Sequence, residues 1–421
     1  MMKNHIRRCR ILSVAAFAGA AATAVGVLGL PTATFAQTEP KEVKVAVVVP
    51  LSGAWARSGE FHVKGAELAI KHINDAGGIK SMAGAKMKLV VVDSGDSTEK
   101  AKNAAQRLVA QEPDVVGGTG AFVSSFSLAV TEVTERAGMP WLTLSYAESI
   151  TSRGYKYVFQ TSMPGGKQAE NALPVVAQVA KSATGKAPVT VGIIMDNTAS
   201  PASFTKPMRA GGFEKLGMKL VVDEIYTPPL SDATSMVQKV RHARPDMLLL
   251  LTTNVPDSKL ILEKMNEMGI GKGRIPVLAS GSSLGMPELM KMMDKSVIDG
   301  VMLISGNWGG KGQEQVIADW RKTTGEPWMT QDAISTYGDM WIFKEAIEIA
   351  GSADREKVAQ ALRTMDTTTG SAKFFPGNRV KFDEQGRRVG ADMVLVQWQD
   401  GEPKAVYPPA LAAAKVAWKK K

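Results

Sequence analysis

The chain has almost no cysteine. Its 421 residues include only Cys9. A single thiol excludes an intrachain disulfide and the multi-cysteine sites that hold zinc or iron–sulfur clusters. Cys9 lies before the first apolar run, so it is not the lipid-bearing cysteine that follows a lipoprotein signal. A mature chain that has lost its N-terminal segment would carry no thiol nucleophile.

Histidine is also scarce, with four residues in the chain. Residues 281–285 match G-x-S-x-G, the hydrolase nucleophile elbow, but that fold needs its histidine after the serine, and every histidine here comes earlier. The chain contains no Walker loop, H-E-x-x-H, EF-hand or G-x-G-x-x-G motif. We therefore expect no catalytic residue, metal or cofactor, and a secreted hydrolase is the alternative from a different class. His62 and His72 fall on one predicted amphipathic helix, where we expect surface exposure.

A concentrated positive charge is missing too. The formal net charge is +10, and removing residues 1–36 takes away four positive and no negative charges, which leaves +6. Apart from residues 419–421 the basic residues are spread out, whereas nucleic-acid binding needs them clustered on one face. No apolar stretch after the first reaches the roughly 18–20 residues of a membrane span. Nucleic acid is therefore not an expected partner.

The N-terminus has the layout of a secretory signal peptide. Four basic residues precede an acid-free apolar run over 11–30, and Thr34-Phe35-Ala36 gives a small-x-small site before Gln37. We predict cleavage near Ala36 and a periplasmic protein. An uncleaved membrane anchor is the alternative, and Arg7-Arg8 leaves general or twin-arginine export open.

The rest of the chain alternates apolar runs with helical patterns, which is typical of parallel α/β units. Hydrophobic residues make up 44% and charged residues 22%, and the length favours two domains. The predicted strands are 43–49, 87–92, 114–117, 140–144, 188–195, 218–226, 246–252, 275–279 and 299–304. The predicted helices are 58–75, 98–111, 124–137, 166–181, 203–216, 232–242, 257–268, 313–324, 331–350 and 354–365.

The stretch 44–79 is the most informative. The apolar run 45–49 predicts a buried strand, Pro50-Leu51-Ser52-Gly53 a turn, and the helix after it ends at Gly77-Gly78. In open α/β sheets, ligands bind at the carboxyl ends of the strands. With PLSG, then G-A-E-L-A and I-N-D-A-G-G-I in that order, the sequence resembles periplasmic solute-binding proteins of the leucine/isoleucine/valine-binding family.

This resemblance implies a type I periplasmic binding protein fold. It has two lobes, each a parallel sheet flanked by helices, joined by a three-crossover hinge near 161–164, 303–306 and 369–376. The implied division is 1–36 signal peptide, 37–161 plus 305–370 first lobe, and 162–304 plus 371–421 second lobe.

On the first lobe, the predicted ligand site follows two strands. We expect the strand to end at Val116, a glycine-rich turn at 117–120, and a helix beginning at Ser124 or Ser125. Helix N-termini bind anions, and the resemblance implies that one of these serines binds a ligand carboxylate, although a plain serine cap fits the pattern too. Four further candidates follow the next strand: Ser145, Tyr146, Ala147 and Glu148. The tyrosine either stacks on the ligand or caps the core of the lobe. The glutamate either pairs with a cationic group of the ligand or is solvated.

On the second lobe, Asn197, Asn254 and Ser282 each follow a predicted strand and would close over the ligand. Relatives usually have an aromatic residue near Ser200, and amino-acid binders often have an acid near Gly281. Both are absent here, which makes aromatic carboxylates or amides alternatives to an amino acid.

The resemblance therefore implies the substrate-binding component of an ABC importer. It would be a monomer that binds a branched-chain or related amino acid between its lobes and meets the membrane permease subunits. Aromatic carboxylates, short-chain amides or urea are the alternative ligands in the same transporter class.

Overall fold

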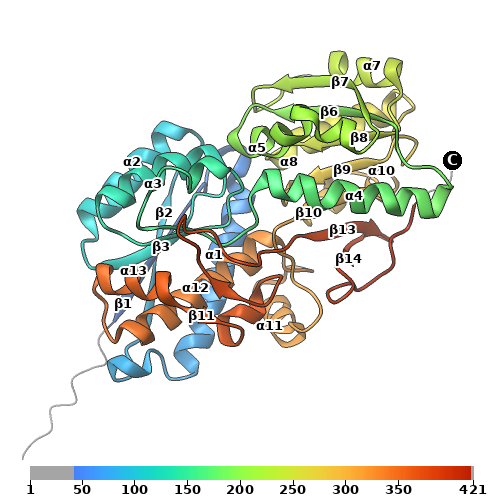
Figure 1. Ribbon diagram of the computed structural model, residues 1–421. Helices are drawn as coiled ribbons and strands as arrows, with labels where there is room; N and C mark the ends of the chain where they lie inside the picture. The colour runs from blue at the N-terminus through green and yellow to red at the C-terminus, as the bar shows by residue number, and fades with distance from the viewer. Residues whose placement is uncertain (1–41, 419–421) are drawn as a thin grey trace, which may run out of the picture. The chain divides into compact units, whose positions relative to one another are not determined.

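The computed structural model describes residues 42–418, and Figure 1 shows two β-sheets there, each with helices packed on it. The predicted signal peptide and residues 419–421 lie outside the described residues. Within 42–418, no helix is long and apolar enough to cross a membrane. The expected α/β fold with two helix-flanked sheets is confirmed.

The first sheet has five parallel strands in the order β2-β1-β3-β4-β5. The short fifth strand was not predicted, because three residues are too few for a periodic signal. The strands are β1 Val43–Val49, β2 Met87–Asp93, β3 Val115–Gly120, β4 Trp141–Thr143 and β5 Val158–Gln160.

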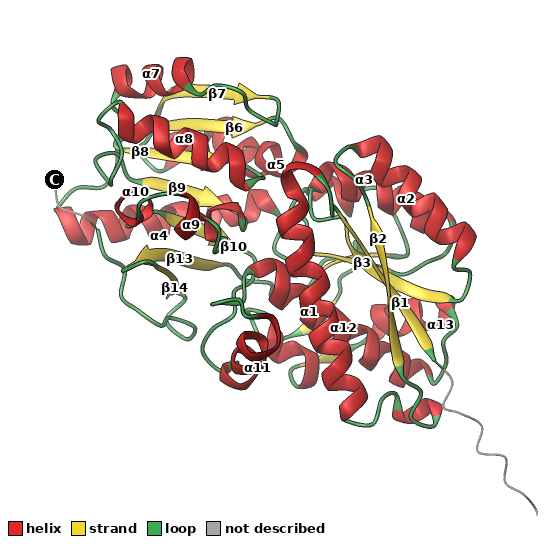
Figure 2. Ribbon diagram, turned by 180° about the vertical axis from the view of Figure 1, so that it is seen from behind, coloured by secondary structure: helices red, strands yellow, loops and turns green. Residues whose placement is uncertain are grey.

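The strand β1 is apolar along its whole length because helices cover both of its faces. Val45 and Val47 pack in the cluster that contains residues of α1 and α12. Ala46 and Val48 point the other way and pack in the cluster of α2 and α3. Figure 2 shows the same arrangement, with α1 and α12 on one side of this sheet and α2 and α3 on the other.

The second sheet has seven strands in the order β14-β13-β10-β9-β8-β6-β7. Its first five strands in sequence are parallel and match the predicted positions within three residues, whereas β13 and β14 run antiparallel. The strands are β6 Thr190–Asp196, β7 Lys219–Tyr226, β8 Met247–Leu251, β9 Val277–Ser280, β10 Met302–Ser305, β13 Val394–Gln399 and β14 Glu402–Tyr407.

The helices agree with the predicted ones except at two places. After β6 one predicted helix is divided at Gly211, which has φ +99°, and the short helices α9 and α10 were not predicted. The helices are α1 Ala56–Asp75, α2 Thr98–Gln111, α3 Ser124–Arg136, α4 Gly165–Thr184, α5 Ala199–Pro207, α6 Phe213–Lys215, α7 Thr234–Ala243, α8 Val255–Glu267, α9 Leu289–Met292, α10 Lys295–Ile298, α11 Glu314–Thr324, α12 Gln331–Ala350 and α13 Arg355–Thr364. A small two-stranded ribbon joins β11 Asp366–Thr367 to β12 Val380–Lys381.

The C-terminal hairpin corrects the expectation of a purely parallel second lobe. Asp400 and Gly401 connect β13 to β14 with φ values of +59° and +88°. An Asp-Gly pair between two apolar stretches is a strong hairpin signal, since both turn residues need positive φ. The sequence carried this signal, but our prediction placed no strand after residue 304.

The glycine run 117–120 also differs from the prediction. It is not a turn but the last four residues of β3, which extends to Gly120. A Cβ atom on Gly117 would lie 2.6 Å from the ring of Phe343, and one on Gly118 would lie 2.6 Å from the ring of Trp141. Glycine is needed here so that aromatic side chains can pack directly on the strand.

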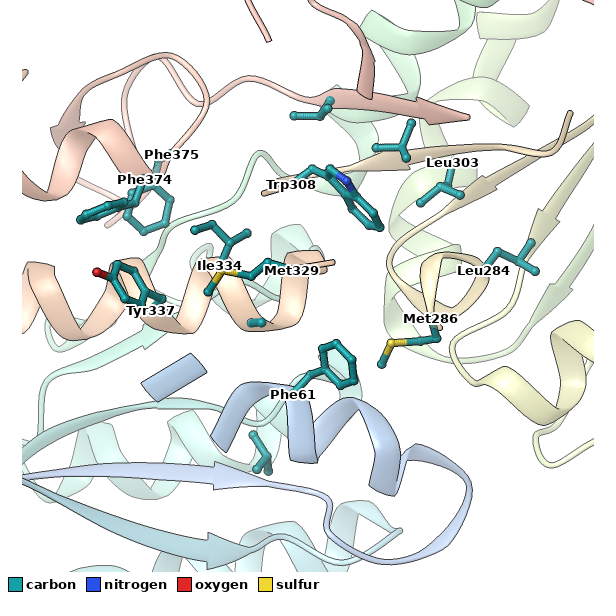
Figure 3. Packing of buried hydrophobic residues seen from close by; sticks show 14 of the residues in the cluster. Phe61, Leu284, Met286, Leu303, Trp308, Met329, Ile334, Tyr337, Phe374 and Phe375 are labelled. Carbon is teal, nitrogen blue, oxygen red and sulfur yellow. The ribbon is translucent and has the colours of Figure 1, made fainter. Parts of the chain in front are cut away.

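The helix α12 returns to the first sheet and packs along α1. A Cβ on Gly65 of α1 would lie 2.3 Å from the carbonyl oxygen of Ala333, so only glycine permits this approach. Apolar side chains continue from here toward the second sheet: Figure 3 shows Phe61 and Ile334 in the same cluster as Met286. The first turn of α12 is therefore positioned where the two sheets meet.

The chain crosses from the first sheet to the second for the last time at a point after the predicted crossover at 369–376. The backbone N–H of Gln160 at the end of β5 donates to the carbonyl of Gly386 at 2.7 Å, and that of Arg388 donates to the carbonyl of Gln160 at 3.0 Å. The chain therefore stays with the first sheet through Arg388 and reaches the second at β13.

Candidate functional site

A cavity of about 30 Å³ lies where the carboxyl ends of strands from both sheets meet. This is the edge at which open α/β sheets bind ligands. The volume admits about two water molecules, so the two sides contact each other closely in this geometry. Its walls are formed by Phe122, Val123, Ser124, Leu144, Ser145, Tyr146, Ser200, Thr252, Thr253, Ser280, Gly281, Ser282, Ser283 and Gln331.

The helix α3 begins at Ser124, as predicted, and this residue is buried at the cavity wall. The Ser124 hydroxyl oxygen accepts hydrogen bonds from the backbone N–H groups of Tyr146 (3.1 Å) and Ala147 (3.2 Å). Because both bonds are accepted, the hydroxyl hydrogen stays available to a ligand. The first N–H groups of an α-helix have no intrahelical acceptor, so this end of α3 is suited to a carboxylate.

The loop before α3 has an unusual backbone. Ala121 and Phe122 have φ values of +62° and +36°, which non-glycine residues rarely adopt. The Phe122 carbonyl accepts a hydrogen bond from the Ser145 hydroxyl at 2.8 Å, and this bond holds the strained loop against the segment that follows β4. Backbone strain of this kind is concentrated at binding sites, where the surrounding structure maintains it.

Tyr146 crosses from the first sheet to the segment after β10. Its phenol oxygen bonds to the side-chain oxygen of Gln331 and accepts from the backbone N–H of Gly306 at 2.8 Å. The ring is 4% exposed, and burial raises the pKa of the phenol well above its usual value. Tyr146 therefore forms a fixed neutral wall of the cavity.

The wall from the second sheet consists of small polar residues that follow β8 and β9. Within the described residues, the buried hydroxyl of Ser280 has no hydrogen-bond partner. Gly281 has φ +93°, and a Cβ placed on it would meet no atom within 4 Å. An unpaired hydroxyl and open space beside it leave room for ligand atoms that accept or donate hydrogen bonds.

Five of the nine predicted site residues do not line this cavity. Ser125 is partly buried and accepts from the backbone N–H of Ala199 at 3.1 Å. Asn197 is exposed and donates to Thr227, and Asn254 is buried as the N-cap of α8. Ala147 packs in the small apolar cluster around Ile150.

Glu148, the fifth, begins a short 3-10 helix over Glu148–Ile150 and is partly buried. Its backbone N–H donates to the Ser203 hydroxyl at 3.3 Å. The four predicted residues that do line the cavity are Ser124, Ser145, Tyr146 and Ser282.

Sequence reasoning missed the residues that α12 contributes. Gln331 lines the cavity, and its side-chain oxygen also accepts from Ser305 at 2.8 Å. Asp332, the next residue, is fully buried and accepts from the Ser282 hydroxyl at 2.8 and 2.9 Å. The signal in the sequence was a polar Gln-Asp pair at the start of a predicted helix.

The expected exposure of His62 is wrong. His62 is 0% exposed, its Nδ1 lies 2.6 Å from the hydroxyl of Thr336, and burial lowers its pKa to about 3. The close packing of α1 on α12 buries it. His72, which lies on the same helix, keeps 23% of its side chain exposed.

Direct contacts join the two sides around the cavity. The indole nitrogen of Trp55 donates to the Thr253 hydroxyl at 3.2 Å. Arg57 of α1 pairs with Glu288, which lies just before α9, and with Glu326, which lies before α12. Arg57 thus connects α1 with residues before α9 and before α12.

The sequence profile of a periplasmic binding protein family matches residues 42–403. The chain belongs to this family, whose members are solute-binding proteins of transporters.

Individual proteins agree with this assignment. A Leu/Ile/Val-binding protein homolog 8 from Brucella melitensis biotype 1 is 26% identical over 390 residues, which cover 90% of this chain and 94% of that protein. The LivJ branched-chain amino acid transporter substrate-binding protein of Streptococcus pneumoniae, solved in complex with isoleucine, has a TM-score of 0.72 at 20% identity, covering 87% of this chain and all of that one. A solute-binding protein from Rhodopseudomonas palustris BisB5, in complex with 3,4-dihydroxybenzoic acid, has a TM-score of 0.71 at 19% identity, covering 89% and 98%.

Proposed function

We propose that this protein is the extracytoplasmic solute-binding component of an ABC importer and that it binds a small carboxylate, a branched-chain amino acid or a related amino acid. One observation carries the choice of a carboxylate. The N-terminus of α3, with the Ser124 hydroxyl held by two backbone N–H groups, faces the cavity at the carboxyl ends of the strands. An unpaired Ser280 hydroxyl faces it from the other side.

Aromatic carboxylates are the second candidate. The Rhodopseudomonas palustris protein with a related fold was solved with a dihydroxybenzoic acid, and the cavity here has Phe122, Leu144 and Tyr146 in its wall. These side chains provide the apolar surface that an aromatic ring needs. Short-chain amides or urea would use the serine hydroxyls and the Gln331 side chain instead.

We also propose that the protein catalyses no reaction. In the G-x-S-x-G segment the central Ser283 hydroxyl donates to the carbonyl of Thr252 at 2.8 Å, and His62 engages Thr336. A serine nucleophile needs a base within hydrogen-bond reach. This arrangement favours a structural role for Ser283.

Titration of the mature protein tests the ligand class. We expect heat of binding, or a rise in melting temperature, with leucine, isoleucine or valine, because a ligand that binds only the native state stabilises it by mass action. Benzoate, 3,4-dihydroxybenzoate, acetamide and urea complete the panel. Binding of an amide or urea with no response to any carboxylate would contradict the proposal.

We propose two lobes, the first built on the sheet that contains β1 and the second on the sheet that contains β6, which close over the ligand about the connecting segments. A cavity of about 30 Å³ is too small for an amino acid to enter or sit in without separation of its walls.

Small-angle scattering should show a larger radius of gyration without ligand and compaction at saturation. Arg57→Gln, which removes the charge that pairs with Glu288, should reduce the compaction. An unchanged radius on binding, with wild type and variant alike, would exclude the closing motion.

Family membership implies an extracytoplasmic location and work with membrane permease subunits. We propose in addition a cleaved signal peptide, a mature N-terminus near Gln37 in the periplasm, and a monomer. The basic N-terminal residues, the apolar run and the small-x-small site at Thr34-Phe35-Ala36 support the cleavage. The intact mass of the denatured exported protein identifies its first residue. The mass measured under native conditions gives its oligomeric state.

A further inference from the structure

A buried carboxylate lies directly behind the wall of the cavity. Asp332, in the first turn of α12, is 0% exposed, and Ser282, which lines the cavity, donates to both of its oxygens at 2.8 and 2.9 Å. The Ser58 hydroxyl also contributes a hydrogen bond to this carboxyl group. Two hydroxyl donors leave part of a carboxylate unsatisfied, because it has about four acceptor positions. Asp332 therefore retains unused acceptor capacity behind the wall of the cavity.

No cationic side chain compensates this carboxylate. Among residues 42–418, no lysine or arginine nitrogen lies within 4.0 Å of it. The nearest titratable nitrogen is Nε2 of His62, 3.8 Å from Oδ1, and burial keeps that ring neutral. A buried charge normally has a partner, since the cost of removing it from water is several kcal/mol.

Unpartnered polar atoms remain beside Asp332 and in the cavity wall. The Nε2 atom of His62, 3.8 Å from Asp332, is buried without a hydrogen-bond partner in the described chain, and so is the Ser280 hydroxyl in the cavity wall. Next to Asp332, the Gln331 side-chain oxygen already accepts from Ser305 and Gly306. Of these two neighbouring residues of α12, Asp332 is the one that can ionise, and it has acceptor positions left.

We propose that Asp332 is the charge partner of a cationic group on the ligand, an ammonium in an amino acid, and that it selects amine-bearing ligands over plain carboxylates. The inference rests on the proposed function and deepens it. Ser282 would rotate so that the ammonium bonds to both its hydroxyl and the Asp332 carboxylate, while the ligand carboxylate lies at the N-terminus of α3. The ammonium and the carboxylate of one amino acid would thus be bound at opposite ends of the cavity.

The open position at Gly281 agrees with this assignment. Gly281 lies beside Ser282 and contributes no charge to the site, so the second-sheet wall itself offers no anion to an ammonium. A carboxylate delivered from α12 behind Ser282 supplies it instead. Aromatic carboxylates without an amine would leave Asp332 uncompensated, which disfavours them by the same electrostatic argument.

The test compares matched ligand pairs that differ in the amine: leucine with 4-methylpentanoate, and phenylalanine with 3-phenylpropanoate. Isothermal titration of the wild-type mature protein should show that one amino acid binds more tightly than its deaminated partner, by about 30-fold or more, as expected for a buried charge partner. Asp332→Asn, which is isosteric but uncharged, should reduce that ratio to within a few-fold of one.

Asp339→Asn is the matched control. Asp339 is also 0% exposed on α12, but it accepts from Thr119 at 2.5 Å and is not in the cavity wall. This variant should keep the wild-type ratio. Circular dichroism and the melting transition establish that both variants fold.

The outcomes separate the two proposals. Tight binding of the deaminated acids with no preference for the amine, or an unchanged preference in Asp332→Asn, overturns the role of Asp332 and leaves the binding function intact. No binding of any of the four compounds, nor of the other carboxylates in the panel, overturns the proposed function and with it this inference.

Discussion

Replacing Ser124 by Ala should weaken the binding of a carboxylate ligand about ten-fold or more. Hydrogen bonds to charged groups contribute roughly 1.5–3 kcal/mol, and 1.4 kcal/mol corresponds to a factor of ten. The Ser124 oxygen is positioned by the N–H groups of Tyr146 and Ala147, and its hydrogen is left to donate to the ligand. Calorimetric titration measures the change in affinity.

Ser125→Ala is the matched control for this prediction. Ser125 is the neighbouring residue of the same helix turn, but it contacts the backbone of Ala199 and does not line the cavity. We expect its loss to change affinity only a few-fold. Equal effects of the two substitutions, or wild-type affinity in Ser124→Ala, would remove Ser124 from the ligand site.

Replacing Asp332 by Asn should make the stability of the protein less dependent on pH. Burial raises the pKa of Asp332 from 3.8 to about 7, against lowering contributions from the Ser282 and Ser58 hydroxyls. Between these values the folded protein holds a proton that the unfolded chain has lost. The stabilisation is therefore complete below pH 4 and is lost as the pH rises to about 7.

The size of this effect follows from the shift, since each unit of pKa corresponds to 1.36 kcal/mol. A decrease in the free energy of unfolding of a few kcal/mol between pH 4 and 7 is expected from Asp332, and Asn cannot contribute it. The other groups that face Asp332 are His62 of α1, whose pKa of about 3 lies outside this interval, and the Tyr146 phenol, whose pKa lies above it. Thermal melts at pH 5 and pH 8 should show a smaller difference in the variant.

Asp75→Asn provides the comparison for the pH measurement. Asp75 is an exposed residue at the end of α1, and its hydrogen bond with Lys71 lowers its pKa. Its removal should leave the loss of stability between pH 5 and 8 in place. Parallel pH profiles of wild type and Asp332→Asn would mean that Asp332 is already ionised at pH 5 in the folded protein.

If both expectations for Asp332 hold, the residue lowers the stability of the ligand-free protein at neutral pH, and its function is to pair with the ligand. Such a trade between stability and function is common at binding sites. The variant would be more stable than wild type at pH 8 and less selective for amine-bearing ligands.

The sequence by itself determined the class of fold and most of its elements. The run 45–49 is apolar on both faces because helices cover both sides of β1, and the glycine pair 77–78, predicted to end a helix, follows α1 with positive φ angles. These features are local, so composition and periodicity are enough to predict them. The same holds for the start of α3 at Ser124.

Only the tertiary structure decided which polar residues share one cavity. Ser282 and Asp332 are fifty positions apart and Tyr146 and Gln331 are 185 apart, and no local pattern connects them. Asn254 shows the opposite case, because a residue that follows a strand in the expected way is used as a helix cap. The close packing of α12 on α1 through Gly65 buries His62 and brings Asp332 behind the cavity wall. Whether a polar side chain is solvated, capped or buried depends on such long-range packing, and that dependence is why the sequence did not identify Asp332.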